Sequence, residues 1–381
     1  MTEARQVRSV AVIGNTAFSL ANFRGPLISS MVERGVRVYA LAPDYEDASR
    51  DAVRALGAEP VDISLERTGL HPIRDVIDLL RLAGTLRRLR PDLVFSYFMK
   101  PVIYGTVAAF LAGIRRRYAL VAGLGYVFTP DGSPDTFKRF VLRTIVSGMY
   151  AVAFRLCGRV FLQNDDDLEI LCGGGTLPRK KALLINGTGV DFARFQPQEY
   201  VLKPVTFILV ARLLREKGIF EYVEAARRIK ATGAAARFVL LGNVDSNPGG
   251  LTWDEVEQWV EQGLIEWPGQ VPDVRVWLAQ SSVFVLPSYR EGKPRSTQEA
   301  MAMALPVLTT DAPGCRDTVK DGLNGFKVPV RDAGALETAM RRFIDEPELI
   351  PQMGRESRIL AEELFDVHRI NRVMLEAMKI S

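Results

Sequence analysis

Short apolar runs alternate with longer amphipathic stretches along this chain, and that alternation restricts its fold more than any other feature. Short apolar runs are typical of buried parallel strands, and amphipathic stretches are typical of the helices that connect them. The pattern therefore predicts an α/β fold with mainly parallel sheets. The predicted strands lie at 9–13, 37–40, 93–97, 119–122, 160–162, 205–210, 236–241, 265–267, 283–286, 307–309 and 325–328. Predicted helices include 73–89, 104–111, 220–230, 253–262, 297–303 and 335–343.

The length of the chain, 381 residues, favours two domains over a single hydrophobic core. Residues 195–204 contain two prolines and show no periodicity, so we place the domain boundary between residues 196 and 197. Ligands of doubly wound sheets bind beyond the carboxyl ends of the parallel strands. We therefore expect two Rossmann-like domains that face each other across a cleft.

The charge is unevenly distributed along the chain. Residues 1–200 carry 26 Lys and Arg against 20 Asp and Glu, whereas residues 201–381 carry 23 against 25. The overall excess of +4 is too small to indicate nucleic acid. A basic first half suits an anionic partner, such as a phosphate-linked acceptor or an acidic membrane surface.

Cysteine and histidine usage excludes several classes of site. Cys157, Cys172 and Cys315 do not have the spacing of metal ligands, and three thiols indicate a reducing compartment. His71 and His368 are the only histidines. A Ser-His-Asp hydrolase or a histidine-rich metal site is therefore not expected.

The sequence contains no segment that predicts membrane insertion. The first residues lead directly into a strand without the apolar region of a signal peptide. The longest charge-free apolar stretch near a basic cluster, residues 144–154, is far shorter than the roughly 20 residues needed to span a bilayer. We expect a cytoplasmic protein, peripheral on the inner face of the cytoplasmic membrane.

The strongest chemical signal lies in residues 288–307. An apolar strand is followed by a Glu-Gly turn, Glu291-Gly292, and a helix is expected to begin near Ser296 and Thr297. A helix amino terminus presents free N–H groups and a positive dipole end, which suit a diphosphate. Glu291 in the loop and Glu299 about one turn into the helix can face the same ligand, where carboxylates accept hydrogen bonds from sugar hydroxyls. For either glutamate alone, a surface helix whose acids complement its dipole is the favoured interpretation.

A second signal is the segment 210–219, again at the end of a predicted strand. Arg212 and Lys217 would project into the same crevice and neutralise a diphosphate leaving group. The plainer interpretation is a solvated Arg/Lys loop. Arg215 is the weaker candidate of this cluster.

Two glycine turns follow other strands. Gly14-Asn15 follows the first strand, where glycine lets the backbone approach a ligand and asparagine can hydrogen-bond it. Gly242-Asn243 occupies the equivalent place in the second domain. The first turn is not a G-x-G-x-x-G fingerprint, so a nicotinamide enzyme is not supported.

Residues 165–167 form a run of three aspartates that has two interpretations. A D-x-D run can hold a divalent metal beneath a nucleotide. Here it precedes an apolar helix, so Asp165 also makes a good N-cap and the other two would complement the dipole. We favour the second interpretation and predict no metal site.

Several motifs within residues 205–330 resemble those of a known family. Residues 284–307 are similar to F-V-L-P-S-x-x-E-G-x-P-x-S-x-x-E-A-M-A-x-x-x-P-V, the signature of family 4 retaining glycosyltransferases. An R-x-x-x-x-K-G element at 212–218 and the stretch 270–278 lie at the expected places upstream. The resemblance implies the GT-B arrangement, a UDP-sugar donor without a cofactor, a metal-independent reaction and an α-linked product. It also implies a donor domain over 197–364 and a helix over 365–381 that crosses back to the first domain.

The resemblance assigns roles to single residues. Glu299 would hold the donor ribose, Arg212 and Lys217 the diphosphate, Glu291 the transferred sugar, and the backbone near Val271 the base. We take Arg212, Lys217 and Glu291 as the catalytic candidates. The remaining donor-binding candidates are Gly14, Gly242, Asn243, Gly292, Ser296 and Thr297.

The first half narrows the resemblance. Segments 96–105 and 120–129 look like a branch that extends polyprenyl-diphosphate-linked glycans, including bacterial N-acetylgalactosaminyltransferases. This implies acceptor-binding roles for Asn15, Lys100, Gly123 and Tyr126. Some relatives carry a histidine where Met99 stands, which weakens the acceptor role of that strand end.

Lys293 is a second departure from the family pattern, since leucine or phenylalanine is usual at its position. Because of this departure, the resemblance does not define which donor sugar is preferred.

The expected mechanism is front-face displacement. The diphosphate departs, stabilised by Arg212, Lys217 and the helix amides, and the acceptor hydroxyl attacks from the same side. The leaving phosphate takes its proton, so no dedicated base is needed. Two alternatives stay open: a sugar-nucleotide epimerase of GT-B fold, and a non-catalytic partner subunit that retains the fold.

The helix predicted over residues 137–156 has two interpretations. An apolar stripe repeats at helical spacing behind a basic start, as in a peripheral helix that dips into an anionic leaflet. The opposite side, with Val146, Tyr150 and Phe154, is also apolar, as in a core helix. The stripe consists of Phe137, Val141, Ile145, Met149, Val152 and Leu156.

Overall fold

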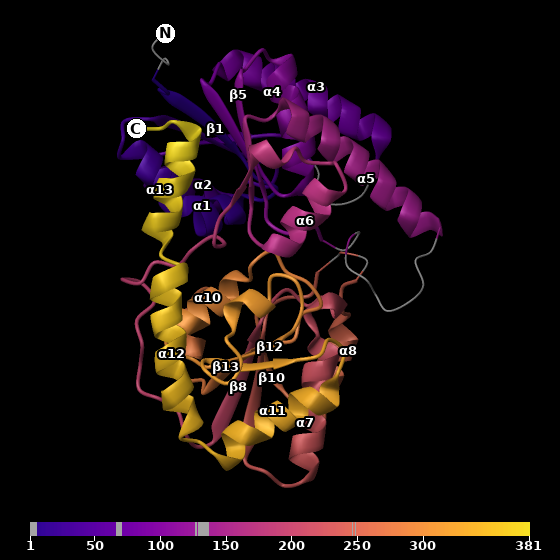
Figure 1. Cartoon of the computed structure of the whole chain (residues 1–381), viewed down its shortest axis with the longest axis vertical. Coiled ribbons are helices and arrows are strands. Elements are labelled where there is room, and N and C mark those ends of the chain that lie inside the picture. Colours follow the sequence, from indigo (N-terminus) through magenta and orange to yellow (C-terminus); the bar gives the residue numbers. More distant parts are fainter. Residues whose placement is uncertain (1–5, 66–70, 126–127, 129–136, 246, 248) are drawn as a thin grey trace. The chain divides into compact units, whose positions relative to one another are not determined.

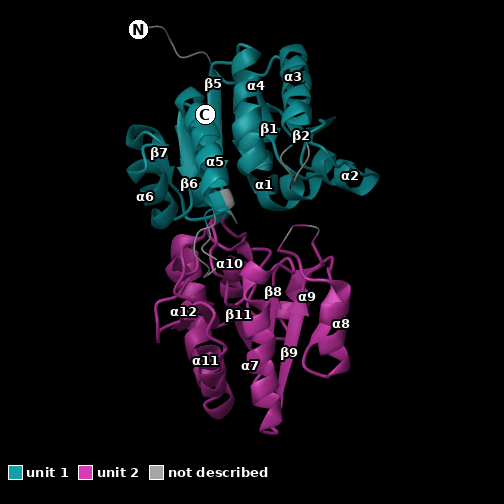
Figure 2. Cartoon of the chain, turned by 90° about the vertical axis from the view of Figure 1, so that its right-hand side faces the viewer, with its two compact units in different colours: residues 1–128, 134–188, 367–381 teal, residues 129–133, 189–366 magenta. Residues whose placement is uncertain are grey.

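The computed structural model describes residues 6–65, 71–125, 128, 137–245, 247 and 249–381. It divides into two compact units (Figure 2). The described residues of unit 1 lie within Met1–Phe128, Pro134–Thr188 and Val367–Ser381, and those of unit 2 within Gly189–Asp366. The boundary expected between residues 196 and 197 falls inside unit 2, because Val190 and Phe195 are buried in the core of that unit.

Unit 1 is a parallel sheet in the order β3-β2-β1-β4-β5-β6-β7, covered by helices (Figure 1). Its strands are β1 Ser9–Ile13, β2 Arg37–Ala42, β3 Glu59–Asp62, β4 Leu93–Tyr97, β5 Arg116–Val121, β6 Arg159–Leu162 and β7 Ala182–Leu184. Its helices are α1 Ala17–Val32, α2 Asp47–Ala55, α3 Pro72–Leu89, η1 Pro101–Gly105, α4 Thr106–Leu111, α5 Phe137–Leu156, α6 Asp165–Gly173, η3 Arg179–Lys181 and α13 Val367–Met378.

The last helix, α13, belongs to unit 1 although it ends the chain. It packs against α1, as Figure 1 shows. Ile370, Met374 and Met378 recur at helical spacing and enter the same core as the strands β1 and β2. Apolar burial on one helix face thus fixes the end of the chain to unit 1.

Unit 2 is a second parallel sheet, in the order β10-β9-β8-β11-β12-β13. Its strands are β8 Val205–Val210, β9 Ala236–Leu241, β10 Glu266–Gly269, β11 Val283–Leu286, β12 Val307–Thr310 and β13 Gly325–Val328. Its helices are η4 Arg215–Lys217, α7 Ile219–Ala231, α8 Trp253–Glu261, α9 Val274–Leu278, α10 Arg295–Ala302, η5 Arg316–Thr318, α11 Ala333–Asp345 and α12 Leu349–Leu364.

The predicted fold class is confirmed, since both sheets are parallel and doubly wound. Two strands were not predicted. β3, with the sequence EPVD, and β7 are the edge strands of the first sheet and are short and only partly buried. An edge strand needs no continuous apolar run, so the hydrophobic pattern of the sequence does not predict it.

Candidate functional site

The two segments with the strongest sequence signals follow neighbouring strands of unit 2. Residues 211–218 follow β8 and residues 287–294 follow β11, and these strands pair although they are not consecutive in the chain. Such a topological switch point is where doubly wound sheets bind ligands. The loops are joined at the Glu216 carbonyl, which accepts from the Tyr289 N–H at 2.8 Å and from the Ser288 hydroxyl at 2.9 Å.

Gly218 allows these two loops to approach each other. Its φ is 72°, in the region that favours glycine. A Cβ at this position would lie 2.1 Å from the Pro287 carbonyl oxygen. Close packing of the two loops therefore requires glycine at this position of the R-x-x-x-x-K-G element.

The site brings Lys217 and Glu291 into direct contact. The Lys217 ammonium donates to Glu291 Oε1 at 2.5 Å, and both side chains are only 14% exposed. A charge-assisted pair of this kind fixes both groups, and the ammonium keeps further donors for a ligand. The pair can therefore present a cation and a carboxylate to one substrate.

Arg212 lies in the same loop but has a different partner. Its guanidinium contacts Asp245 Oδ2 at 3.0 Å, on the loop that follows β9. Arg212 is exposed, so a bound anion can reach it. Arg215, the weaker candidate, pairs instead with Glu255 at 2.9 Å and stacks on Phe220.

The amino terminus of α10 stands next to this pair in the chain. Pro294, its N-cap, supplies no side-chain hydrogen bond, so the amides of the first turn have no side-chain cap. In the described part of the chain, the buried hydroxyl of Thr297 also has no hydrogen-bond partner. This helix terminus therefore offers its first-turn amides and the Thr297 hydroxyl to a bound anion.

Glu299, the predicted ribose ligand, is paired within its own helix. Its Oε1 accepts from Arg295 Nε at 2.8 Å, and both side chains are largely buried. A ribose that binds Glu299 would share this carboxylate with Arg295. Ser296, beside them, is half-buried in the first turn.

The strand ends of β9 and β10 carry three further predicted donor residues. Gly242 has φ 144°, and a Cβ there would lie 1.8 Å from the Ala211 carbonyl oxygen. Its N–H donates to Gly269 and its carbonyl accepts from Trp267, so both backbone groups are already used. Gly242 therefore serves close packing of the β8 and β9 ends.

Asn243 and Val271 lie beside this packed turn. The Asn243 side chain accepts from the backbone N–H of Val244 at 3.0 Å. Val271 is half-buried against the core of unit 2. Asn243 follows β9 and Val271 follows β10, and their donor-binding roles stay predictions.

The described predicted residues of unit 1 follow the neighbouring strands β1, β4 and β5, and the switch point of this sheet lies between β1 and β4. Gly14 donates its N–H to Leu41, and a Cβ there would lie 2.6 Å from the Tyr97 hydroxyl. Asn15 is half-buried at the same strand end. Gly123 follows β5 with φ 113°. Tyr126 lies outside the described residues.

Lys100 has a partner that the sequence did not reveal. Its ammonium contacts Asp75 Oδ1 at 2.9 Å, and the Tyr104 hydroxyl donates to Asp75 Oδ2 at 3.0 Å. Lys100 and Asp75 are both buried. The sequence did not indicate this pair, because Asp75 lies on α3, 25 residues away from Lys100.

The aspartate run forms the first turn of α6, which begins one residue earlier than expected. Asn164, not Asp165, is the N-cap, and its side chain accepts from the Asp167 N–H at 2.7 Å. Asn164 has the extended backbone that an N-cap requires. The described residues contain no cluster of histidine, cysteine and acidic groups that could hold a metal ion.

Two of the cysteines, Cys157 and Cys315, are buried thiols of low reactivity. Burial raises the pKa of the Cys315 thiol to about 12 and that of the Cys157 thiol to about 11. Both stay protonated near neutral pH, so neither is an activated nucleophile.

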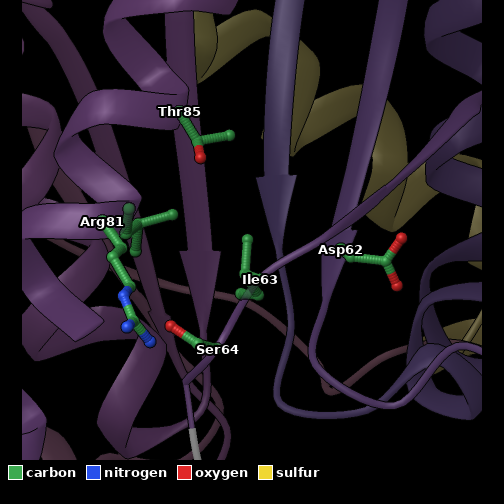
Figure 3. Close-up of a pocket in the computed structure, with 6 residues that line it drawn as sticks. Asp62, Ile63, Ser64, Arg81 and Thr85 are labelled. Atoms are coloured by element: carbon green, nitrogen blue, oxygen red, sulfur yellow. The ribbon is translucent and has the colours of Figure 1, made fainter.

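A hollow of about 270 Å³ in unit 1 lies apart from these residues (Figure 3). Its walls include Ser64 and Arg81, whose polar ends lie on the same side, whereas the Asp62 carboxylate points away from them. Asp62 pairs with Arg50 at 2.7 Å. The hollow adjoins the edge strand β3, which β2 separates from the switch point.

Known proteins resemble the chain in both sequence and fold. Residues 204–346 match the family described as glycosyl transferases group 1. The chain has the GT-B fold and is a glycosyltransferase, which confirms the expected class.

The names of two relatives state the reaction that each catalyses. One is N,N'-diacetylbacillosaminyl-diphospho-undecaprenol alpha-1,3-N-acetylgalactosaminyltransferase of Campylobacter jejuni, 26% identical, with 89% of this chain and 90% of the relative covered. Another is UDP-Gal:alpha-D-GlcNAc-diphosphoundecaprenol alpha-1,3-galactosyltransferase of Escherichia coli, 26% identical, with 80% and 78% covered. Anabaena HepE, solved with UDP-glucose, shares the fold with a TM-score of 0.76 at 16% identity, over 97% and 99% of the chains.

Proposed function

We propose that this glycosyltransferase moves an N-acetylhexosamine, such as GalNAc, from a UDP-sugar to a polyprenyl-diphosphate-linked glycan, with retention of configuration. The observation that carries the proposal is the Lys217–Glu291 pair at the β8/β11 switch point, beside the uncapped amino terminus of α10. Relatives that act on diphospho-undecaprenol-linked sugars support the acceptor class.

The residues of unit 2 have separate roles in the proposed reaction. Lys217, Arg212 and the first-turn amides of α10 stabilise the departing diphosphate. Glu291 orients the transferred sugar, and Glu299 binds the ribose. The bond from C1 to the phosphate oxygen breaks, the acceptor oxygen bonds to C1 on the same face, and the acceptor proton passes to the leaving phosphate. No metal takes part.

The residues of unit 1 are proposed to bind the acceptor. Lys100 would do so from a fixed position, because Asp75 pairs with it and Tyr104 in turn holds Asp75. Asn15 at the end of β1 adds an amide for a sugar hydroxyl.

Release of nucleoside diphosphate from UDP- and GDP-sugars tests the proposal. With EDTA present, we expect release from one UDP-N-acetylhexosamine only when a bacterial polyprenyl-diphosphate glycolipid is added. Release that requires a divalent metal would remove the metal-independent mechanism, and conversion of the donor without acceptor would indicate an epimerase.

Thr297→Val should weaken UDP binding about tenfold without lowering stability. The hydroxyl is buried and unpartnered in the described structure, so valine costs the folded protein little. A lost hydrogen bond to phosphate accounts for the weaker binding. Calorimetric titration with UDP and thermal unfolding check this. Thr309→Val is the control: its hydroxyl donates to Leu286 at 2.8 Å, so it should lose stability and keep the UDP affinity.

We propose, further, that unit 1 docks on an anionic membrane. No helix in the described residues is long and apolar enough to cross a bilayer. α3 has its two acids, Asp75 and Asp78, buried, while Ile73, Val76 and Leu80 are exposed. The exposed charges of α3 are all arginines. This pattern suits an interfacial helix on an acidic leaflet.

α5 extends the same surface. α3 packs against α4, and α4 packs against α5 (Figure 1). Of the two apolar sides of α5, Val146, Tyr150 and Phe154 enter the core, whereas Ile145 and Val152 are exposed. α5 contains no acidic residue.

Val76→Glu should reduce flotation with anionic liposomes several-fold, because it places a carboxylate on the docking helix. Val276→Glu on α9 of unit 2 is the matched control, since Val76 is 52% and Val276 54% exposed. Equal loss in both variants, or no flotation of the wild type with any vesicles, would remove the membrane proposal.

A further inference from the structure

Lys293 is a largely buried cation beside the proposed donor site. It lies two residues after Glu291, and its side chain is only 8% exposed. An ammonium withdrawn from water needs an anionic partner. That partner is Asp317 on η5, with Nζ and Oδ2 3.5 Å apart. The separation exceeds a normal N–H···O bond, so both groups keep capacity for a third group.

The backbone holds this pair in place. The Lys293 carbonyl accepts from the buried Gln298 side chain at 3.2 Å, and the Glu291 N–H donates to Pro313 at 2.9 Å. Gly314 has φ 74°, and a Cβ there would lie 2.3 Å from the Glu291 carbonyl oxygen. Residues 313–317 are therefore packed against residues 291–293, and the pair connects the turn that carries Glu291 to η5.

We propose that Lys293 and Asp317 together hydrogen-bond the C4 hydroxyl group of the transferred sugar and so select between hexoses that differ at that position. This inference rests on the proposed function. A sugar hydroxyl both donates and accepts, and the pair offers it an ammonium donor and a carboxylate acceptor. The two charges balance, so a neutral hexose fits better than a uronic acid, whose carboxylate would meet Asp317.

A specificity role and a purely structural role predict different results. A pair that only ties two loops together would affect every donor by the same factor. A pair that binds a hydroxyl changes the ratio between two donors that differ at that hydroxyl, because a buried polar group left unpaired is costly. The ratio therefore separates the two roles.

The test compares UDP-GalNAc and UDP-GlcNAc, which differ only in the orientation of the hydroxyl at C4. For wild type, Lys293→Leu, Asp317→Asn and Lys320→Leu, we would measure kcat/KM with glycolipid acceptor and Kd by calorimetry for both donors and for UDP. Lys320, an exposed lysine on the neighbouring turn, is the control. We expect the donor ratio to change by about tenfold or more in the two pair variants and the UDP affinity to stay within about twofold.

The outcomes distinguish this inference from the proposed function. An unchanged donor ratio in Asp317→Asn, which nearly preserves shape, overturns the inference even if Lys293→Leu does not fold. The wild type could show no transfer while the ratio of Kd between UDP-GalNAc and UDP-GlcNAc depends on Lys293. That result overturns the transferase function but supports the role of the pair in selecting the sugar. A ratio that shifts equally in Lys320→Leu also overturns the inference.

Discussion

Replacing Lys217 with methionine is expected to lower kcat/KM about 10²- to 10³-fold, the size of effect that follows loss of one preorganised electrostatic group. Lys217 is held by Glu291 at 2.5 Å, so its charge is already in place when the diphosphate begins to leave. Methionine keeps much of the side-chain length and removes the charge. Steady-state kinetics with a saturating acceptor measure the effect, and most of the loss should lie in kcat, because the leaving group gains its charge only in the transition state.

Arg215→Met provides the control on the same short helix. Arg215 is 55% exposed and pairs with Glu255, away from the Lys217–Glu291 pair. A change of no more than a few-fold is expected, because an exposed ion pair contributes little. If Arg215→Met were as harmful as Lys217→Met, general positive charge in this loop, rather than the placement of Lys217, would explain the activity.

Gly218→Ala should destabilise the protein by about 3 kcal/mol and abolish transfer, since it combines two penalties. An L-residue at φ 72° costs about 1 kcal/mol, and its Cβ would lie 2.1 Å from the Pro287 carbonyl oxygen, which is backbone and cannot rotate away. The loops that carry Lys217 and Glu291 would have to separate. Urea unfolding and the transfer assay measure the two effects.

Gly233→Ala separates the two penalties. Gly233 has φ 75°, but a Cβ there would meet nothing within 4 Å. We expect a loss of about 1 kcal/mol and normal transfer. Equal destabilisation by the two alanines would show that the close approach of the loops is unimportant.

The sequence predicted the central strands of both sheets because buried parallel strands are continuous apolar runs. It did not predict β3, whose residues are partly buried at the sheet edge. The domain boundary was also displaced: the prolines of residues 195–204 indicated irregular chain, but Phe195 is buried with the second core. Irregular structure can therefore still be packed into a domain.

For the candidate site, the sequence placed Lys217 and Glu291 on separate strand ends. It could not show their contact, which depends on β8 and β11 being neighbours in the sheet. Asp245, the partner of Arg212, lies after another strand, β9, and no sequence pattern links it to Arg212. Such pairs follow from topology, which single-sequence patterns do not specify.

The anomeric configuration of the product, measured by proton NMR after transfer from an α-linked UDP-N-acetylhexosamine to the polyprenyl-diphosphate glycolipid, tests the central claim most directly. Front-face transfer at the Lys217–Glu291 site predicts an α-linked disaccharide terminus. A β-linked product, or no acceptor-dependent product from any UDP-sugar, would contradict it.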